Sequence, residues 1–138
     1  PAMTELLGGQ IDLMCDQTTN TTEQIKGGTI KAYAVTTPAR LAVFPDLPTV
    51  SEGGMPGMEV SVWHGLYAPK GTPADVVERL SASLQSALAD PGIAEKLGEL
   101  GTAPSPAADA TPAGLKAKLE AEIARWKPVI ETAGVYAD

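Results

Sequence analysis

Hydrophobic residues recur with two different spacings along this chain, and the spacing changes near its middle. In the second half they return every three or four positions, which is typical of amphipathic α-helices. Three helices are predicted there, beginning at Thr72-Pro73, Asp90-Pro91 and Thr111-Pro112, because a capping side chain followed by proline favours a helix start. Their apolar stripes, expected to pack on a core, are Val76, Val77, Leu80, Leu84 and Leu88; Ile93, Leu97 and Leu100; and Leu115, Leu119, Ile123, Trp126 and Ile130.

The last of these helices contains a proline. Pro128 removes a backbone donor and crowds the preceding turn, so a kink or an end of the regular helix is expected near Trp126. Gly134 then provides a typical C-terminal stop.

The first half of the chain alternates between two kinds of pattern. A helix is predicted from Pro1 to the Gly8-Gly9 pair, and a second over residues 18–26, before Gly27 and Gly28. Between and after them, residues 11–17 and 29–37 carry alternating or β-rich patterns that predict strands. This order indicates an α/β fold with a parallel sheet and helices on its faces.

A long connection rich in proline and glycine follows the second predicted strand. Residues 38–58 favour irregular structure with at most one helical turn, near Thr49–Glu52. Such a length is unusual in a compact domain without a functional reason. Residues 58–69 then resume extended structure.

Composition narrows the class of protein. The chain has 138 residues, 43% of them hydrophobic and 20% charged, which suits a globular domain with a core. Its net charge of −7 argues against nucleic acid or an anionic membrane as a partner. A single cysteine excludes an internal disulfide and a cysteine-based zinc site, and the sequence indicates no other metal site and no cofactor.

Because the chain opens inside a helical pattern without a preceding cap, a longer parent protein is expected.

Cys15, Asp16 and His64 raise the question of an enzyme. A thiolate activated by imidazole could attack a carbonyl group. However, no nucleophile-elbow glycines surround Cys15, which occupies a strand pattern where a small buried residue is expected. His64 is the only histidine and has no metal-ligand spacing around it. No catalytic residue is therefore predicted.

Ligand chemistry is better supported at residues 16–19. Asp16, Gln17, Thr18 and Thr19 lie where a predicted strand turns into a helix, and open α/β sheets bind ligands at that edge. Free N–H groups and hydroxyls converge at such a turn. The alternative is that Thr18, Thr19 or Asn20 only caps the helix.

The segments "PDLPTVSEGGMPG", "APKGTP" and "ARWKPVI" resemble the tripartite tricarboxylate transporter substrate-binding proteins, also called Bug receptors, and the resemblance runs along the whole chain. It implies a periplasmic-binding-protein-like two-lobed fold, present here only in its C-terminal part. Residues 1–60 would be the rear part of the second, ligand-binding lobe. Residues 61–138 would be the strand that crosses between lobes and the C-terminal helices of the first lobe.

The same resemblance implies function. The parent would be a periplasmic receptor that captures a small carboxylate or amino acid and delivers it to the membrane components of a tripartite transporter. The positions implied for ligand binding are Pro1, Ala2, Met3, Asp16, Gln17, Thr18, Thr19, Trp63 and His64. The chain departs from the family's usual residues at Cys15, at Thr18-Thr19 and at His64, so the identity of the carboxylate stays open.

Two alternatives stay open beside the receptor. One is a small enzyme that depends on Cys15 and His64, and the other is a stand-alone interaction domain. If the chain is part of a larger receptor, its helix stripes and strand edges lack their covering, and self-association is expected.

Overall fold

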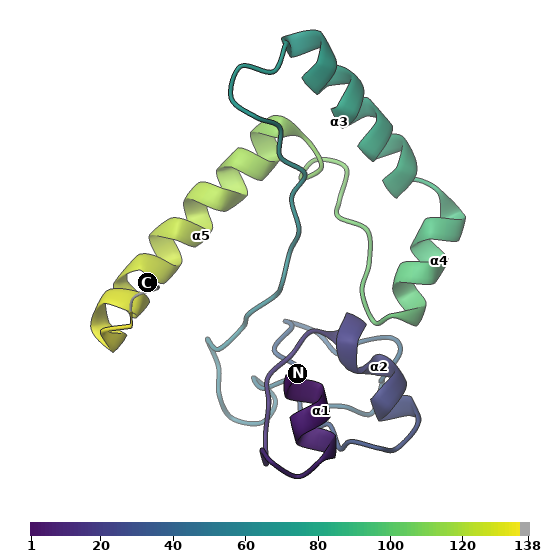
Figure 1. Cartoon of the computed structure of the whole chain (residues 1–138), viewed down its shortest axis with the longest axis vertical. Coiled ribbons are helices and arrows are strands. Elements are labelled where there is room, and N and C mark those ends of the chain that lie inside the picture. Colours follow the sequence, from purple (N-terminus) through teal and green to yellow (C-terminus); the bar gives the residue numbers. More distant parts are fainter. Residues whose placement is uncertain (136–138) are drawn as a thin grey trace. The chain divides into compact units, whose positions relative to one another are not determined.

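The computed structural model describes residues 1–135 as five helices joined by irregular segments (Figure 1). They are α1 (Ala2–Leu7), α2 (Thr18–Lys26), α3 (Ala74–Leu88), α4 (Pro91–Glu99) and α5 (Pro112–Ala133). The chain divides into two compact units, each described by itself below. The first contains Pro1–His64 and Pro91–Ala103, and the second contains Gly65–Asp90 and the chain from Pro104 onward. The expected assignment of residues 1–60 and 61–138 to two lobes stays a prediction.

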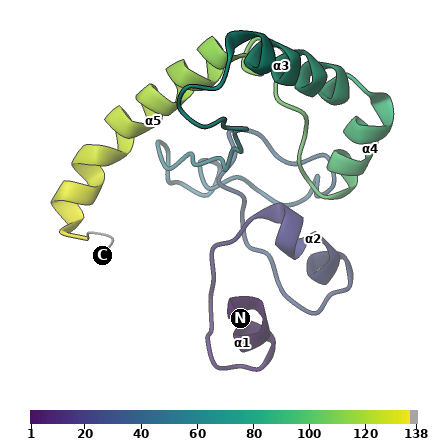
Figure 2. The same cartoon turned by 45° about the horizontal axis from the view of Figure 1, so that its top comes forward.

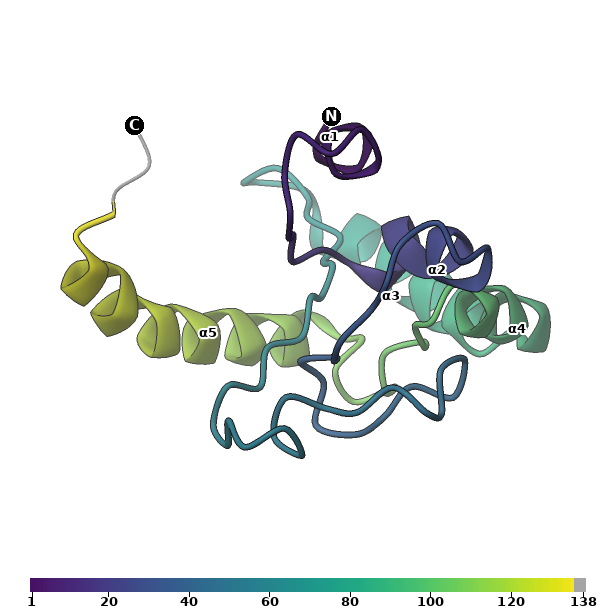
Figure 3. The ribbon, with the colours of Figure 1, turned by 90° about the horizontal axis from the view of Figure 1, so that it is seen from below.

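The predicted helices of the first unit are confirmed. α1 ends at Gly8 and α2 at Gly27, and both glycines donate their N–H to carbonyls of the last turn. Gly28 follows with φ +68°, a left-handed conformation that costs glycine little. α2 and α4 lie side by side (Figure 3), and the Lys26 ammonium group at the end of α2 donates to the Glu99 carbonyl at the end of α4 at 3.1 Å.

The predicted strands do not form among residues 1–135. The only bridge there is an isolated parallel one between Val35 and Thr49, in which the Val35 N–H donates to the Pro48 carbonyl at 2.9 Å. The Val60 N–H adds a bond to the Thr36 carbonyl at 2.9 Å. Residues 11–17 and 61–69 form no ladder with the rest of the described chain. A strand needs a neighbour for its backbone groups, so an alternating pattern alone does not produce one.

The connection over residues 38–58 is irregular, as predicted (Figure 3). Its glycines lie in turns. Its one helical turn begins at Thr49, whose carbonyl accepts from the Gly53 N–H at 3.1 Å.

The helices of the second unit begin by two different devices. At α5 the Thr111 hydroxyl accepts from the Gly114 N–H at 2.9 Å, with Pro112 in the first turn, as predicted. At α3 the N-cap is Pro73, and the Thr72 hydroxyl donates instead to the Pro69 carbonyl at 2.8 Å. The predicted cap at Thr72 is therefore wrong by one residue.

α5 continues through Pro128 as one helix of 22 residues and ends at Gly134 with φ +65° (Figure 2). The expected end near Trp126 does not occur. Trp126 instead donates its indole N–H to Glu122 at 2.8 Å, one turn earlier.

The expected core is absent from the described chain. None of its hydrophobic residues is buried, and the apolar stripes of the helices stay partly exposed. Val76 and Leu80 of α3 are 38% and 44% exposed, and Ile123 of α5 is 56% exposed. The stripes have the predicted spacing, but residues 1–135 do not cover them.

Candidate functional site

The start of α2 gathers four of the residues predicted to bind ligand. Gln17 is the N-cap, with extended backbone at φ −74° and ψ 145°, and Thr18 and Thr19 form the first turn. The backbone N–H groups of a first turn have no acceptor inside the helix, and they form the positive end of the helix dipole. Thr19 is exposed and Thr18 is half-buried, so part of this turn faces solvent.

Asp16 is held against this helix start by polar contacts. Its Oδ1 accepts from the Gln17 N–H at 2.8 Å and from the Asn20 side-chain amide at 3.2 Å. Oδ2 lies 3.5 Å from the same amide, which is long for a hydrogen bond, so this exposed oxygen keeps acceptor capacity. The turn therefore offers both N–H donors and a carboxylate acceptor.

The hydroxyl of Thr18 is used inside the protein. It donates to the Gly101 carbonyl at 3.0 Å, and one turn later the hydroxyl of Thr22 contacts the Thr18 carbonyl at 2.8 Å and the Leu100 carbonyl at 3.1 Å. Neither Thr18, Thr19 nor Asn20 caps α2, so the capping alternative is wrong. The proton of the Thr18 hydroxyl is used in the hydrogen bond to the Gly101 carbonyl and is not available to the expected ligand.

The other expected ligand-binding positions lie elsewhere in the first unit. Pro1 is the N-cap of α1, a helix of six residues with Ala2 and Met3 in its first turn. Within residues 1–135 no hydrogen bond or ion pair joins this turn to Asp16–Thr19. Trp63 is half-buried, and His64 is exposed at the boundary of the unit.

The structure corrects the expectation for Cys15. Its thiol is exposed and not buried in a strand, because residues 11–17 have no partner to form a sheet. Within the described residues no hydrogen bond links Cys15 to His64, and no cluster of three metal-ligating side chains occurs.

Among the helices of residues 1–135, none combines the length and the apolar character that a membrane span needs.

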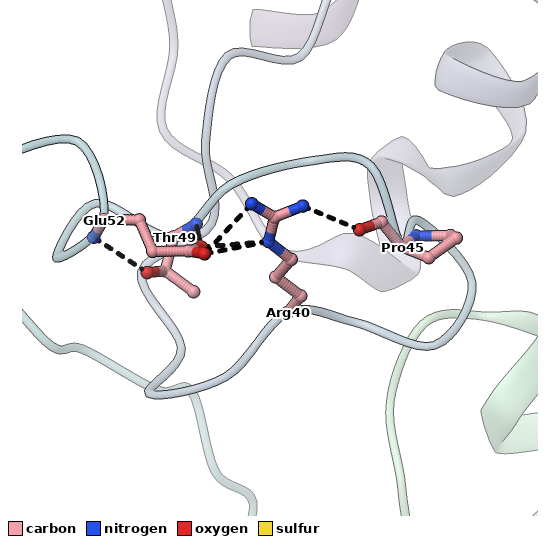
Figure 4. A network of polar contacts seen from close by, with 4 residues as sticks. All are labelled: Arg40, Pro45, Thr49 and Glu52. Carbon is pink, nitrogen blue, oxygen red and sulfur yellow. Dashed lines mark hydrogen bonds and ion pairs between the residues drawn. The ribbon is translucent and has the colours of Figure 1, made fainter.

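Sequence reasoning missed a polar network in the connection over residues 38–58 (Figure 4). Arg40 binds Glu52 through Nε, 3.0 Å from both carboxylate oxygens, and through a second nitrogen 3.0 Å from Oε1. Its remaining nitrogen donates to the Pro45 carbonyl at 3.0 Å. Thr49 and Glu52 also exchange reciprocal bonds of 2.8 and 3.1 Å. The Thr-x-x-Glu spacing, a capping box, could have been recognised in the sequence, but the arginine could not.

These contacts shift the ionisation of the pair. The hydrogen bond from Arg40, followed by that from the Thr49 N–H, lowers the pKa of Glu52 from 4.5 to about 2. The same carboxylate raises the pKa of Arg40. The network keeps the loop of residues 40–52 closed.

Comparison with known proteins identifies the family. Residues 1–135 match the family described as "Tripartite tricarboxylate transporter family receptor". The chain belongs to this family. A UPF0065 protein from the TAR-I ttuE-ttuC' intergenic region of Agrobacterium vitis is 56% identical over 134 residues, which are 97% of this chain and 39% of that protein.

Two solved structures extend the likeness to the fold. The periplasmic binding protein BugD is 51% identical, with a TM-score of 0.92 over 100% of this chain and 46% of BugD. MatC from Rhodopseudomonas palustris, solved with bound malate, is 38% identical, with a TM-score of 0.88 over 94% of this chain and 44% of MatC. The expected periplasmic-binding-protein fold is therefore confirmed, and the chain spans less than half the length of these relatives.

Proposed function

We propose that this chain supplies part of a periplasmic solute-binding receptor that captures a small carboxylate. The observation that carries the proposal is the likeness to MatC, whose structure contains malate and whose backbone matches 94% of this chain. The receptor would deliver its ligand to the membrane components of a tripartite transporter, as the family description suggests. The family is one of binding receptors, so we propose no catalytic role for Cys15 or His64.

The start of α2 is the proposed ligand turn. One ligand carboxylate would accept from the backbone N–H groups of Thr18 and Thr19 and from the Thr19 hydroxyl, with Gln17 at the edge of the turn. Pro1, Ala2 and Met3 at the start of α1, and Trp63 with His64, are proposed to complete the ligand surface. Support for these residues is the family resemblance.

Asp16 would repel a second carboxylate, so we propose that its exposed Oδ2 accepts from a hydroxyl or ammonium group of the ligand. This assignment favours 2-hydroxy acids and amino acids over plain dicarboxylates. L-malate and succinate differ by that hydroxyl alone and are therefore the matched pair of probes.

Isothermal titration calorimetry of the chain with L-malate and with succinate tests the proposal. We expect malate to bind more tightly than succinate. Asp16→Asn should reduce the ratio of the two affinities by about fivefold or more, as the loss of a charged hydrogen bond predicts. Equal affinities in the wild type would contradict the role of Asp16. Binding of neither acid, also after fusion to the complementary part of BugD, would contradict the carboxylate receptor.

A further inference from the structure

The start of α2 is fixed by a junction between two segments that are far apart in the sequence. The Thr18 hydroxyl of α2 donates to the Gly101 carbonyl just after α4, and the Thr22 hydroxyl, which lies 2.8 Å from the Thr18 carbonyl, also lies 3.1 Å from the Leu100 carbonyl. Thr22 is only 1% exposed, so its hydroxyl is shut off from solvent. A buried hydroxyl is stable only when bonded, so these contacts specify how α2 sits against the end of α4.

Gly101 makes this close approach possible. Its φ of +74° is left-handed, and its carbonyl is presented to Thr18. A Cβ at this position would stand 3.1 Å from Thr18 Cβ, 3.1 Å from Val43 Cγ1 and 3.2 Å from Thr22 Oγ1. Three segments therefore meet where a side chain would be crowded: the first turn of α2, the end of α4, and the loop closed by Arg40 and Glu52.

We propose that the Thr18 side chain positions the ligand turn and that its hydroxyl is not a ligand contact. Its hydroxyl has one proton, and that proton is committed to Gly101, so it cannot also be donated to a ligand carboxylate. The Thr19 hydroxyl has no hydrogen-bond partner within residues 1–135 and is exposed. The two adjacent threonines thus divide two tasks: Thr18 anchors the turn and Thr19 binds. The proposal rests on the proposed function, because it assigns roles within that site.

Amide hydrogen exchange and malate affinity, measured on the same variants of the 138-residue chain, test this division. The reporting amides are those of Gly101 and Thr102, which donate to Gly98 and Leu97 at 3.0 Å at the end of α4. Thr18→Val, which keeps the shape but removes the hydroxyl, should speed their exchange about fivefold and weaken malate binding by a similar factor. Thr18→Ser restores the hydroxyl and should restore both properties.

Thr19→Val is the matched control. It should weaken malate binding by about fivefold or more and leave the exchange of Gly101 and Thr102 unchanged. Weaker binding by Thr18→Val without faster exchange would make the Thr18 hydroxyl a ligand contact and overturn the proposal. Unchanged exchange in Thr18→Val, or unprotected amides in the wild type, would also overturn it. If malate does not bind to any variant, also after fusion to the complementary part of BugD, the proposed ligand fails, while the exchange comparison still tests the anchor.

Discussion

At the scale of single residues, two side chains and one glycine show how local chemistry is fixed by distant neighbours. Glu52 is stabilised as a carboxylate by Arg40, twelve positions away in the sequence. Gly101 contacts residues of α2 that are more than seventy positions earlier. Neither partnership has a signature at its own position.

Glu52 is expected to stay ionised far into acid. Because its pKa in the folded chain is lowered to about 2 from 4.5, its contribution to stability is complete above about pH 4.5 and is lost as the pH falls toward 2. Carbon-detected NMR of the Glu52 carboxyl group measures the midpoint directly. Arg40→Gln should move that midpoint back toward 4.5, and an unchanged midpoint would contradict the pairing.

Alanine at Gly101 is expected to be costlier than alanine at a glycine with a similar backbone angle. Gly28 has φ +68°, and a Cβ added there would meet open space, so Gly28→Ala should cost about 1 kcal/mol from backbone strain alone. Gly101→Ala adds contacts of 3.1 Å and should cost about 2–3 kcal/mol. Urea unfolding of both variants measures the difference, and equal costs would show that the junction is loose.

At the scale of elements, the local sequence rule for a helix start holds at one helix of the second unit and fails at another. The Thr111 cap uses a side chain three residues from its partner, so the sequence alone suffices. The Thr72 start looks the same in sequence, yet its hydroxyl turns back to Pro69. Two similar threonine-proline pairs therefore provide a natural comparison.

Removing the two threonines should have unequal effects. Thr111→Ala loses a true N-cap and should destabilise the first turn of α5 by about 1 kcal/mol. Thr72→Ala loses only an exposed bond within a turn and should cost less than about 0.5 kcal/mol. Amide exchange at Gly114 for the first variant and at Val76 for the second reports each helix start. An equal loss of protection would mean that Thr72 also supports its helix.

At the scale of the whole molecule, exposed apolar residues lie both on the helices and in the irregular segments of the described chain. Large exposed hydrophobic residues on α5 alone include Ile123, Val129 and Ile130, at 56%, 52% and 45% exposure. Single exposed residues are ordinary, but monomers rarely keep large contiguous apolar patches. We expect these helix faces to contact other polypeptide.

We therefore expect the isolated chain to form dimers or larger species at micromolar concentration, as sedimentation velocity would detect. Ile123→Lys combined with Ile130→Lys should reduce association, because it places charge in the apolar stripe. The matched control, Ala117→Lys with Ala121→Lys, adds equal charge on the opposite side of the same helix and should have little effect. A monomeric wild type would contradict this expectation.

Sequence pattern and tertiary structure determined different parts of this protein. Helices end at Gly8, Gly27 and Gly134 as expected, because stop signals act within one turn of the chain. The family was also evident from sequence, since long motifs persist where folds do. Local pattern left a ligand turn and a simple helix cap both open at residues 16–19, and it did not distinguish the tasks of Thr18 and Thr19.

Only the tertiary structure decided which partners those residues meet. Residues 11–17 have a strand pattern and form no strand in the described chain, since a β-ladder needs a second segment that periodicity does not supply. For the same reason Cys15 is exposed. The Thr18 hydroxyl could have faced a ligand or a carbonyl with equal local preference. Its contact with Gly101 depends on α4 returning to α2, and hydrogen bonds between distant segments are set by the path of the backbone and not by the residues around each donor.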